Sequence, residues 1–321
     1  MLFLIQENAA IFFHSHATLY SMVAAGLVIS LVACGSESDS NDINNGDSEL
    51  GQILFESSQE DDFFTRDIIV TDTEGQNLVN LTNGDTSEEQ PAWSPDKSEI
   101  AYSSLGDIFV IDVDGENPRN LTDSTRDDTN PRWSPDGNKI VFVSDYSATS
   151  LDDGEIRVID VDGSNDQILF DSDMADTDPA WSPDGNKIAF ASWRDGPNAD
   201  IFIIDADGNN PENLTEDKSE IHRYPAWSPD GTKIAYSMRT QPSVNHHDLF
   251  VMDADGNNPQ VLADTEEEHD KRPTWSPQGD RIAFISDRDE TRNLFIIDAD
   301  GENLENLTDS AVSHDWPDWA E

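Results

Sequence analysis

Apolar residues from position 51 onward come in short runs of three to six, separated by polar stretches rich in Asp, Asn, Ser and Gly. Runs such as Ile-Ala-Phe at 188–190 and Asp-Ile-Phe-Ile-Ile-Asp at 200–205 are rich in β-branched and aromatic residues. Short runs of this composition, repeated at intervals of about 8–12 residues between turn residues, predict strands rather than helices. The pattern therefore favours an all-β fold.

The motif Trp-Ser-Pro-Asp-Gly, or a close variant of it, recurs along this stretch, and each tryptophan lies two residues after a proline. The repeated tryptophans are Trp93, Trp133, Trp181, Trp227, Trp275 and, near the end of the chain, Trp319. The steps between them are 40, 48, 46, 48 and 44 residues. Periods of about 40–50 residues are typical of propellers and other repeat arrays.

Each repeat divides into four predicted strands. Pro-x-Trp forms the first strand, a Ser-Pro-Asp-Gly turn leads to a second strand of the Ile-Ala-Phe type, and a variable loop leads to the third. An Asp-x-Asp-Gly hairpin turn then leads to a fourth strand, which ends near Asn-Leu-Thr. The third strands are predicted at Asp107–Asp112, Glu155–Asp160, Asp200–Asp205, Asp248–Asp253 and Asn293–Asp298.

The two ends of this region complement each other. Residues 51–82 contain a second, third and fourth strand, and residues 317–321 contain a first strand alone. Joining them removes the open sheet edges of the array. We therefore predict a six-bladed β-propeller of four-stranded blades over residues 51–321, closed by the C-terminal strand. Deleting residues 313–321 should open the ring, and losing Trp319 should cost about 3–5 kcal/mol if it is buried.

The repeat Pro-x-Trp-Ser-Pro-Asp-Gly, continued by Ile-Ala-Phe and Asp-Ala-Asp-Gly, resembles the TolB-type β-propeller repeat, and near-complete copies of it cover residues 51–321. The resemblance implies a non-enzymatic module that binds an envelope protein or another ligand. Oligogalacturonate lyases have a similar propeller and use a His-bound metal in the channel. A metal-dependent, carbohydrate-active enzyme with histidines at the channel mouth is therefore the alternative.

The N-terminus has the features of an export signal. Residues 22–34 are apolar and end in Leu31-Val32-Ala33-Cys34, which resembles the lipobox of bacterial lipoproteins. We expect residues 1–34 to be a signal peptide, Cys34 to be lipidated, and residues 35–50 to form a disordered acidic tether. The resemblance implies a periplasmic or extracellular protein anchored to the outer membrane. No Lys or Arg precedes Arg66, so an uncleaved membrane anchor is the alternative.

Composition narrows the classes of function. The chain has 67 acidic and 18 basic residues and a formal net charge of −49, which excludes ordinary nucleic-acid binding and argues against docking on an anionic membrane through a basic patch. A single cysteine excludes an intrachain disulfide. No catalytic or cofactor motif is present, so we expect no cofactor. We also expect a monomer that contacts the membrane only through the lipid on Cys34. The Asp-x-Asp-Gly segments are interpreted as hairpin turns, with a calcium loop as the alternative.

The candidate site comes from loop positions. In a propeller, the loops that lead into first strands and those that join second to third strands share one face, here called the mouth face. The Ser-Pro-Asp-Gly and Asp-x-Asp-Gly turns share the other, here called the turn face. In the blades of Trp227, Trp275 and Trp319 the mouth-face segments carry histidines, cations and aromatic residues, whereas those of the other blades are acidic. The candidate binding residues are His222, Arg223, Tyr224, His246, His247, His269, Lys271, Arg272, His314 and Trp316.

These residues predict a binding patch for a partner that is acidic or carries a carboxylate, because Arg and aromatic residues are enriched at interface hot spots. Scattered solvated residues and a His-ligated metal site are the alternatives. Histidines near a pKa of about 6.5 should strengthen binding in mild acid. Replacing Arg223, Tyr224, Lys271 and Arg272 with Ser should abolish binding with little loss of stability, and the turn face should be a solvated surface.

Overall fold

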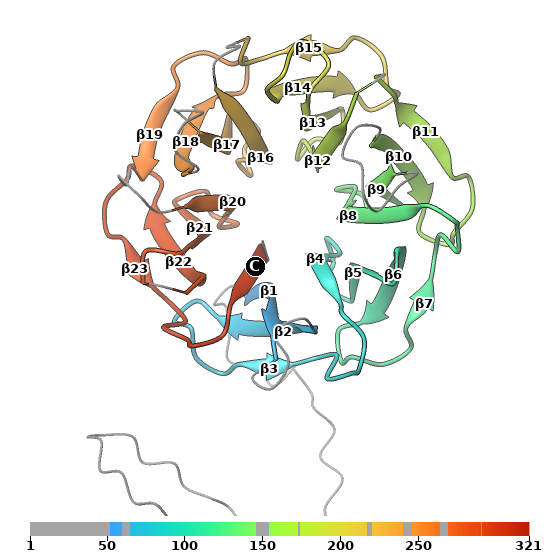
Figure 1. The fold of residues 1–321 in the computed structure, drawn as a ribbon, viewed down its shortest axis with the longest axis vertical. Coiled ribbons are helices and arrows are strands. Elements are labelled where there is room, and N and C mark those ends of the chain that lie inside the picture. Colours follow the sequence, from blue (N-terminus) through green and yellow to red (C-terminus); the bar gives the residue numbers. More distant parts are fainter. Residues whose placement is uncertain are drawn as a thin grey trace, which may run out of the picture. The chain divides into compact units, whose positions relative to one another are not determined.

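The computed structural model describes residues 52–59, 65–145, 154–172, 174–216, 220–239, 246–263, 269–289 and 291–320. The expected signal peptide and tether lie outside these residues. The described part of the chain forms 24 strands in six four-stranded antiparallel sheets arranged as a ring (Figure 1). The predicted six-bladed β-propeller is therefore confirmed. Within the described residues no helix has the length and apolar character needed to cross a membrane.

Blade 1 contains β24, β1, β2 and β3, and blades 2 to 6 contain β4–β7, β8–β11, β12–β15, β16–β19 and β20–β23. The first strands surround the central axis and are β24 (His314–Ala320), β4 (Glu89–Trp93), β8 (Asp127–Trp133), β12 (Asp176–Trp181), β16 (Ile221–Trp227) and β20 (Asp270–Trp275). The second strands are β1 (Gln52–Ser58), β5 (Glu99–Ser104), β9 (Lys139–Asp145), β13 (Lys187–Ser192), β17 (Lys233–Arg239) and β21 (Arg281–Ser286).

The third strands are β2 (Arg66–Asp72), β6 (Asp107–Asp112), β10 (Glu155–Asp160), β14 (Asp200–Asp205), β18 (Asp248–Asp253) and β22 (Asn293–Asp298). The fourth strands form the outer edge and are β3 (Val79–Asn80), β7 (Arg119–Asn120), β11 (Gln167–Phe170), β15 (Glu212–Asn213), β19 (Gln260–Ala263) and β23 (Glu305–Asn306). The five predicted third strands have the observed bounds. The first strands, in contrast, begin several residues before Pro-x-Trp.

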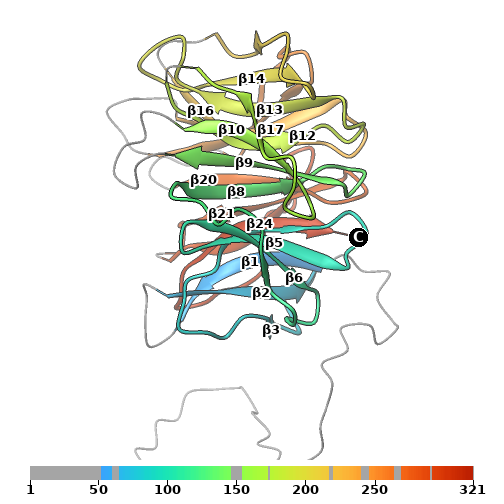
Figure 2. The same ribbon diagram turned by 90° about the vertical axis from the view of Figure 1, so that its right-hand side faces the viewer.

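The two kinds of turn meet on one face of the ring, as expected. In blade 4 the Ala206 amide of the Asp-Ala-Asp-Gly turn donates a hydrogen bond to the Asn186 carbonyl of the neighbouring Ser-Pro-Asp-Gly turn, at 2.8 Å. Figure 2 shows that the strands of the blades run between this turn face and the mouth face. In the Asp-x-Asp-Gly turn of blade 2, Asp114 accepts a hydrogen bond from the Glu116 amide at 3.0 Å, and Asp112 accepts one from Asn117 at 2.7 Å. These carboxylates therefore serve the hairpin turn.

The hydrophobic core formed by the described residues is divided into six clusters, and each cluster lies between two neighbouring blades. Between blades 2 and 3, for example, Ala101 and Ile108 pack with Trp133 and Phe142. The indole nitrogen of Trp133 also donates a hydrogen bond to the Ala92 carbonyl of blade 2, at 3.2 Å. Since both faces of each sheet are covered by neighbouring blades, every blade depends on the next one to bury its apolar surface.

The ring closes through pairing of β24 with β1, in which Ile53 lies opposite Trp319 and Ser57 lies opposite His314. A side-chain oxygen of Asp318 in β24 also accepts a hydrogen bond from the Trp93 amide of blade 2, at 2.7 Å. Trp319 is only partly buried, against the cluster between blades 6 and 1. Trp319 therefore does not meet the condition of full burial on which the expected cost rested.

Candidate functional site

A ring of six residues with left-handed backbone lines the central channel. Each precedes the proline of a first strand, has φ between 49° and 57°, and lies where the pairing register with the second strand shifts. This pre-proline ring consists of Gln90, Asn130, Asp178, Tyr224, Arg272 and Trp316. A left-handed conformation costs an L-residue about 1–2 kcal/mol. The β-bulge re-aims the strand so that this one residue of each blade faces the channel.

Two pockets follow one another along the channel, and Asn130, Tyr224, Arg272 and Trp316 line both. The mouth pocket, about 580 Å³, opens beside the loops between second and third strands, which include Leu105. The turn-face pocket, about 460 Å³, is walled by the prolines and tryptophans of the Trp-Ser-Pro motifs. The four shared side chains therefore form the partition between the two pockets.

Cations and aromatic rings alternate in the partition. The guanidinium carbon of Arg272 lies 4.1 Å from the ring centroid of Trp316 and 4.9 Å from that of Tyr224. Arg223 covers Tyr224 at 4.6 Å, and the rings of Tyr224 and Trp316 meet edge to face at 5.7 Å. Cation–π contacts of this kind are worth about 0.5–2 kcal/mol each, so the side chains hold one another in place.

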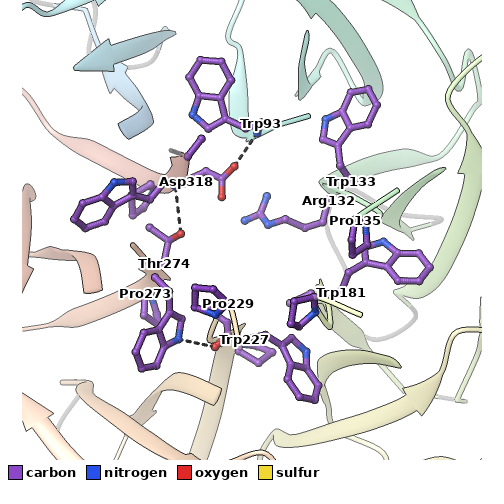
Figure 3. Close-up of a pocket in the computed structure, with 18 of the residues that line it drawn as sticks. Trp93, Arg132, Trp133, Pro135, Trp181, Trp227, Pro229, Pro273, Thr274 and Asp318 are labelled. Carbon is purple, nitrogen blue, oxygen red and sulfur yellow. Dashed lines mark hydrogen bonds between the residues drawn. The ribbon is translucent and has the colours of Figure 1, made fainter. Parts of the chain in front are cut away.

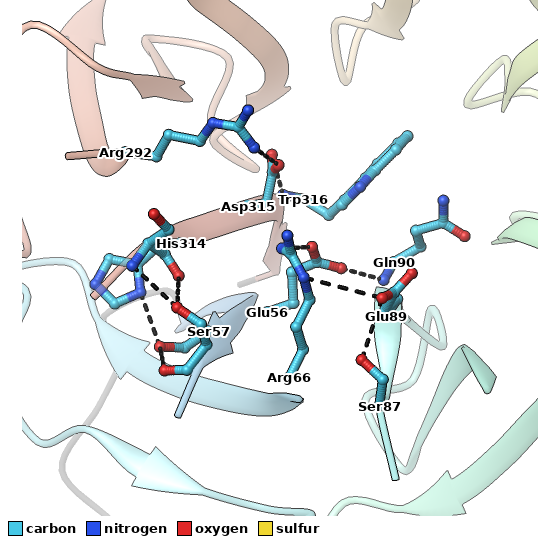
Figure 4. A network of polar contacts seen from close by, with 12 residues as sticks. Glu56, Ser57, Arg66, Ser87, Glu89, Gln90, Arg292, His314, Asp315 and Trp316 are labelled. Atoms are coloured by element: carbon cyan, nitrogen blue, oxygen red, sulfur yellow. Dashed lines mark hydrogen bonds and ion pairs between the residues drawn. The ribbon is translucent and has the colours of Figure 1, made fainter. Parts of the chain in front are cut away.

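Ion pairs fix the same arginines to neighbouring blades. Arg223 of β16 binds the buried Asp178 of β12 at 2.9 Å, and Arg272 of β20 binds the buried Asp315 of β24. Figure 4 shows that Asp315 also binds Arg292, at 3.2 Å. Burial alone would lower the pKa of Arg272, but the attraction of Asp315, together with that of Tyr224 and Glu56, outweighs burial and raises that pKa.

Two expectations are corrected by these contacts. Arg223, Tyr224, Lys271, Arg272 and Trp316 lie in strands rather than in loops. The two arginines also connect blades through buried carboxylates, so replacing all four candidates with Ser would not leave stability nearly unchanged. A substitution meant to test binding at these residues therefore has to leave the two ion pairs intact.

The five candidate histidines divide into two groups, and neither group lines the mouth pocket or the turn-face pocket. His222 and His314 are buried, 3% and 4% exposed. They lie three residues before the proline of Pro-x-Trp, at the position that holds Glu88, Asp128, Asp176 and Asp270 in the other blades. Nδ1 of His222 lies 3.4 Å from a carboxylate oxygen of Asp200, and Nδ1 of His314 lies 3.1 Å from the Ser57 hydroxyl (Figure 4). Burial lowers the pKa of His314 to about 4.

The second group lies between blades 5 and 6 on the mouth face. His247 and His269 face each other with their Nδ1 atoms 3.4 Å apart, and Nε2 of His246 lies 3.9 Å from Asp248. Burial, together with the positive charge of Lys271, lowers the pKa of His247 to about 2 and also lowers that of His269. The low pKa values of His247 and His314 correct the expectation that these two side chains become charged in mild acid, and the lowering at His269 acts in the same direction.

Lys271 belongs to this second group, and burial and the neighbouring Arg272 lower its pKa to about 8. Among the described residues, no group of three or more His, Cys, Asp or Glu side chains could hold a metal ion.

The structure brings four of the ten candidates, Arg223, Tyr224, Arg272 and Trp316, to the channel. Their charge is opposed by acidic residues on the other side of the mouth pocket, which are Glu89, Asp127, Asp128 and Asp145.

Sequence reasoning missed the floor of the turn-face pocket. Arg132 and Asp318 occupy the middle position of Pro-x-Trp, where three of the other first strands have Ala and one has Thr. Both line this pocket, and Figure 3 shows both side chains directed into the channel. Comparing the repeats at that one position would have singled out these two charged residues.

Comparisons with known proteins support the same fold. No protein-family model and no curated protein matches the sequence. Among solved structures, TolB from Acinetobacter baumannii superposes with a TM-score of 0.71 and 23% identity over 84% of this chain and 66% of that chain. The chain thus spans slightly less than two thirds of that TolB. A structure assigned to TolB of Agrobacterium tumefaciens gives a TM-score of 0.65 and 20% identity, covering 80% of this chain and 88% of that one.

Propellers of other proteins are also similar. An oligogalacturonate lyase in complex with manganese has a TM-score of 0.57 and 15% identity, with 80% of this chain and 73% of that chain covered. A chain of a nidogen/laminin complex has a TM-score of 0.64 and 13% identity, with 84% and 98% covered. At these identities the comparisons establish the fold, and the chain is a six-bladed propeller of the kind found in TolB proteins.

Proposed function

We propose that this propeller is a non-enzymatic binding module of the cell envelope that holds an envelope protein or an acidic ligand at its mouth face. The observation that carries the proposal is the polarised mouth pocket, in which Arg223, Tyr224, Arg272 and Trp316 face an acidic wall. Aromatic and Arg side chains held rigidly in a concave site are typical of binding hot spots. The likeness to TolB structures and to a chain of a nidogen/laminin complex supports the proposal.

A photo-crosslinking amino acid placed at Leu105 tests this proposal in the full-length chain in cells. Leu105 is 80% exposed and lines the mouth pocket, so a bound partner should form a discrete adduct there. The same amino acid at Asn209, exposed in a turn-face hairpin, serves as the control. Tyr224→Ala removes an aromatic wall and leaves the Arg223 and Arg272 ion pairs, and it should abolish the adduct. Equal labelling from both positions, or an adduct unaffected by Tyr224→Ala, would refute binding at the mouth.

The proposed anchor is the lipid on Cys34, which lies outside the described residues. Replacing Cys34 with Ser should release the protein from the membrane to the soluble fraction. A Ser variant that stays in the membrane would instead indicate an uncleaved N-terminal helix.

The alternative, a metal-dependent carbohydrate-active enzyme, is favoured by the likeness to an oligogalacturonate lyase in complex with manganese. In this chain the facing pair of His247 and His269 would supply two metal ligands. Elemental analysis of the purified protein separates the proposals. Stoichiometric metal that disappears in a His247→Asn, His269→Asn double variant would favour the enzyme, and metal-free protein that still forms the Leu105 adduct would favour the binding module.

A further inference from the structure

The turn-face pocket has a charged floor inside an apolar wall. Arg132 extends into the channel from β8 of blade 3, and Asp318 extends into it from β24 of blade 1 (Figure 3). Around them stand the rings of the Trp-Ser-Pro motifs, among them Trp181, Trp227 and Pro229. The pocket volume of about 460 Å³ lies within the range of small-molecule sites. This face is therefore hollowed around two charges, which corrects the expectation of a merely solvated surface.

The guanidinium of Arg132 uses few of its donors. Its one hydrogen bond within the described residues goes from Nη1 to the Pro131 carbonyl, at 2.8 Å, and no ion pair within 4.0 Å is formed there. A guanidinium has five N–H donors in a fixed fork that matches a carboxylate. Burial lowers the pKa of Arg132, and the attraction of Asp318 does not outweigh it. Arg132 therefore has unused capacity for an anionic group.

Asp318 complements Arg132, because its carboxylate has unused capacity for a cationic group. One of its oxygens accepts the Trp93 amide at 2.7 Å, and within the described residues it has no ion-pair partner within 4.0 Å. Burial raises the pKa of Asp318, and the attraction of Arg132 again does not outweigh it. The carboxylate can therefore accept a cationic donor from a ligand.

The other charges that line this pocket favour a ligand with both signs of charge. Asp178 is paired with Arg223, and Arg272 is paired with Asp315, so neither pair leaves a free charge. Lys97 adds a positive charge from the blade 2 turn. A pure anion would leave Asp318 uncompensated, and a pure cation would do the same to Arg132.

We propose that the turn-face pocket binds a compact zwitterion with an apolar body, of the free α-amino acid type. The carboxylate of the ligand binds Arg132, its ammonium group binds Asp318, and its side chain packs against the Trp and Pro rings of the wall. The two opposite charges of an α-amino acid lie a few bonds apart, and they match the separated charges of Arg132 and Asp318. The Trp and Pro rings supply apolar surface against which the side chain of the ligand is buried. This site lies on the opposite side of the partition from the proposed mouth-face site and does not depend on it.

Isothermal titration calorimetry of the full-length chain with L-leucine and L-phenylalanine tests the proposal. N-acetyl-L-leucine lacks the ammonium group and L-leucinamide lacks the carboxylate, so each should bind about tenfold more weakly or worse than L-leucine. Arg132→Gln and Asp318→Asn should weaken L-leucine binding by a similar factor. Asn keeps an oxygen for the Trp93 amide, and thermal melting checks that both variants are folded.

Lys139→Gln is the matched control, because it removes one positive charge from the same blade at a partly exposed ion pair with Asp160, away from the pocket. It should leave L-leucine binding unchanged. Failure of both amino acids to bind the parent protein at millimolar concentration would overturn the proposal. Equal binding of L-leucine to Arg132→Gln, or of the two blocked analogues to the parent, would overturn it as well. None of these results changes the expected crosslink at Leu105.

Discussion

Arg272 illustrates how one side chain serves both the channel and the scaffold. Its guanidinium stacks on Trp316 inside the channel while it binds the buried Asp315 of the neighbouring blade. Removing one partner of a buried pair leaves the other charge uncompensated, which costs more than the pair itself contributes. A residue that faces a ligand site can therefore be a main determinant of stability.

Replacing Arg272 with Met should lower the free energy of unfolding by about 3 kcal/mol, because the half-exposed Arg292 is then the one ion-pair partner that Asp315 retains among the described residues. The double variant Arg272→Met, Asp315→Asn should recover part of this loss. Denaturant unfolding measures both. Lys139→Met, at the partly exposed pair with Asp160, is the control and should cost about 1 kcal/mol or less. Similar losses for Arg272→Met and the control would show that the interblade pair contributes little.

His314 gives stability a defined dependence on pH. Its pKa is about 4 in the folded protein, against 6.5 for an unperturbed histidine, because the ring is buried beside Ser57. Between these values the unfolded chain binds a proton that the folded protein does not, so acidification favours unfolding. The unfolding free energy of the parent minus that of His314→Gln should fall by up to about 3 kcal/mol between pH 7 and pH 4.

The comparison with the variant cancels groups that act in the opposite direction, such as Asp176, whose pKa burial raises to about 6. Urea unfolding at several pH values gives the difference directly. A difference that stays constant with pH would show that His314 is not held neutral by its surroundings.

At the scale of elements, turns and third strands follow from local sequence, whereas the bulges do not. Asp-x-Asp-Gly fixes a hairpin through its own side chains, so the strands on either side have predictable bounds. The pre-proline ring has no such signal, because Gln90, Tyr224 and Trp316 share no property that favours left-handed backbone. The ion pairs of Arg223 and Arg272 also escaped prediction, since they depend on which residues of different blades come to face each other.

The Ser-Pro-Asp-Gly turn offers a test of turn chemistry within one molecule. Its fourth residue is left-handed, with φ of 71° at Gly137 and 57° at Lys97, which occupies the same place in blade 2. Only glycine adopts this backbone without steric cost. Lys97→Gly should therefore raise the free energy of unfolding by about 1 kcal/mol.

The reverse exchange, Gly137→Lys, is the matched control and should destabilise the protein by a similar amount. Thermal or denaturant unfolding of both variants provides the measurement. Destabilisation by Lys97→Gly would indicate that the lysine side chain contributes more than its backbone conformation costs.

At the scale of the whole molecule, stability depends on completing the ring. Each hydrophobic cluster needs two blades, and blade 1 obtains its inner strand from β24. Deleting residues 313–321 should expose the edge of β1 and part of two clusters, and we expect a much lower melting temperature with broadened unfolding. Trp319→Ala, which keeps the strand, should cost less than about 3 kcal/mol because the ring is only partly buried. An unchanged melting temperature after the deletion would contradict closure by β24.

The pairing of β1 with β24 also has a consequence for biosynthesis. Ser58 and Ser313, which exchange hydrogen bonds in this closure, lie 255 residues apart in the chain. Bringing such distant segments together is entropically costly and becomes possible only after ribosomes have added the final strand. Until then every nascent chain presents an open edge of β1, a surface on which partly made copies can associate. A holding chaperone that covers this strand would protect the protein during the whole of its synthesis.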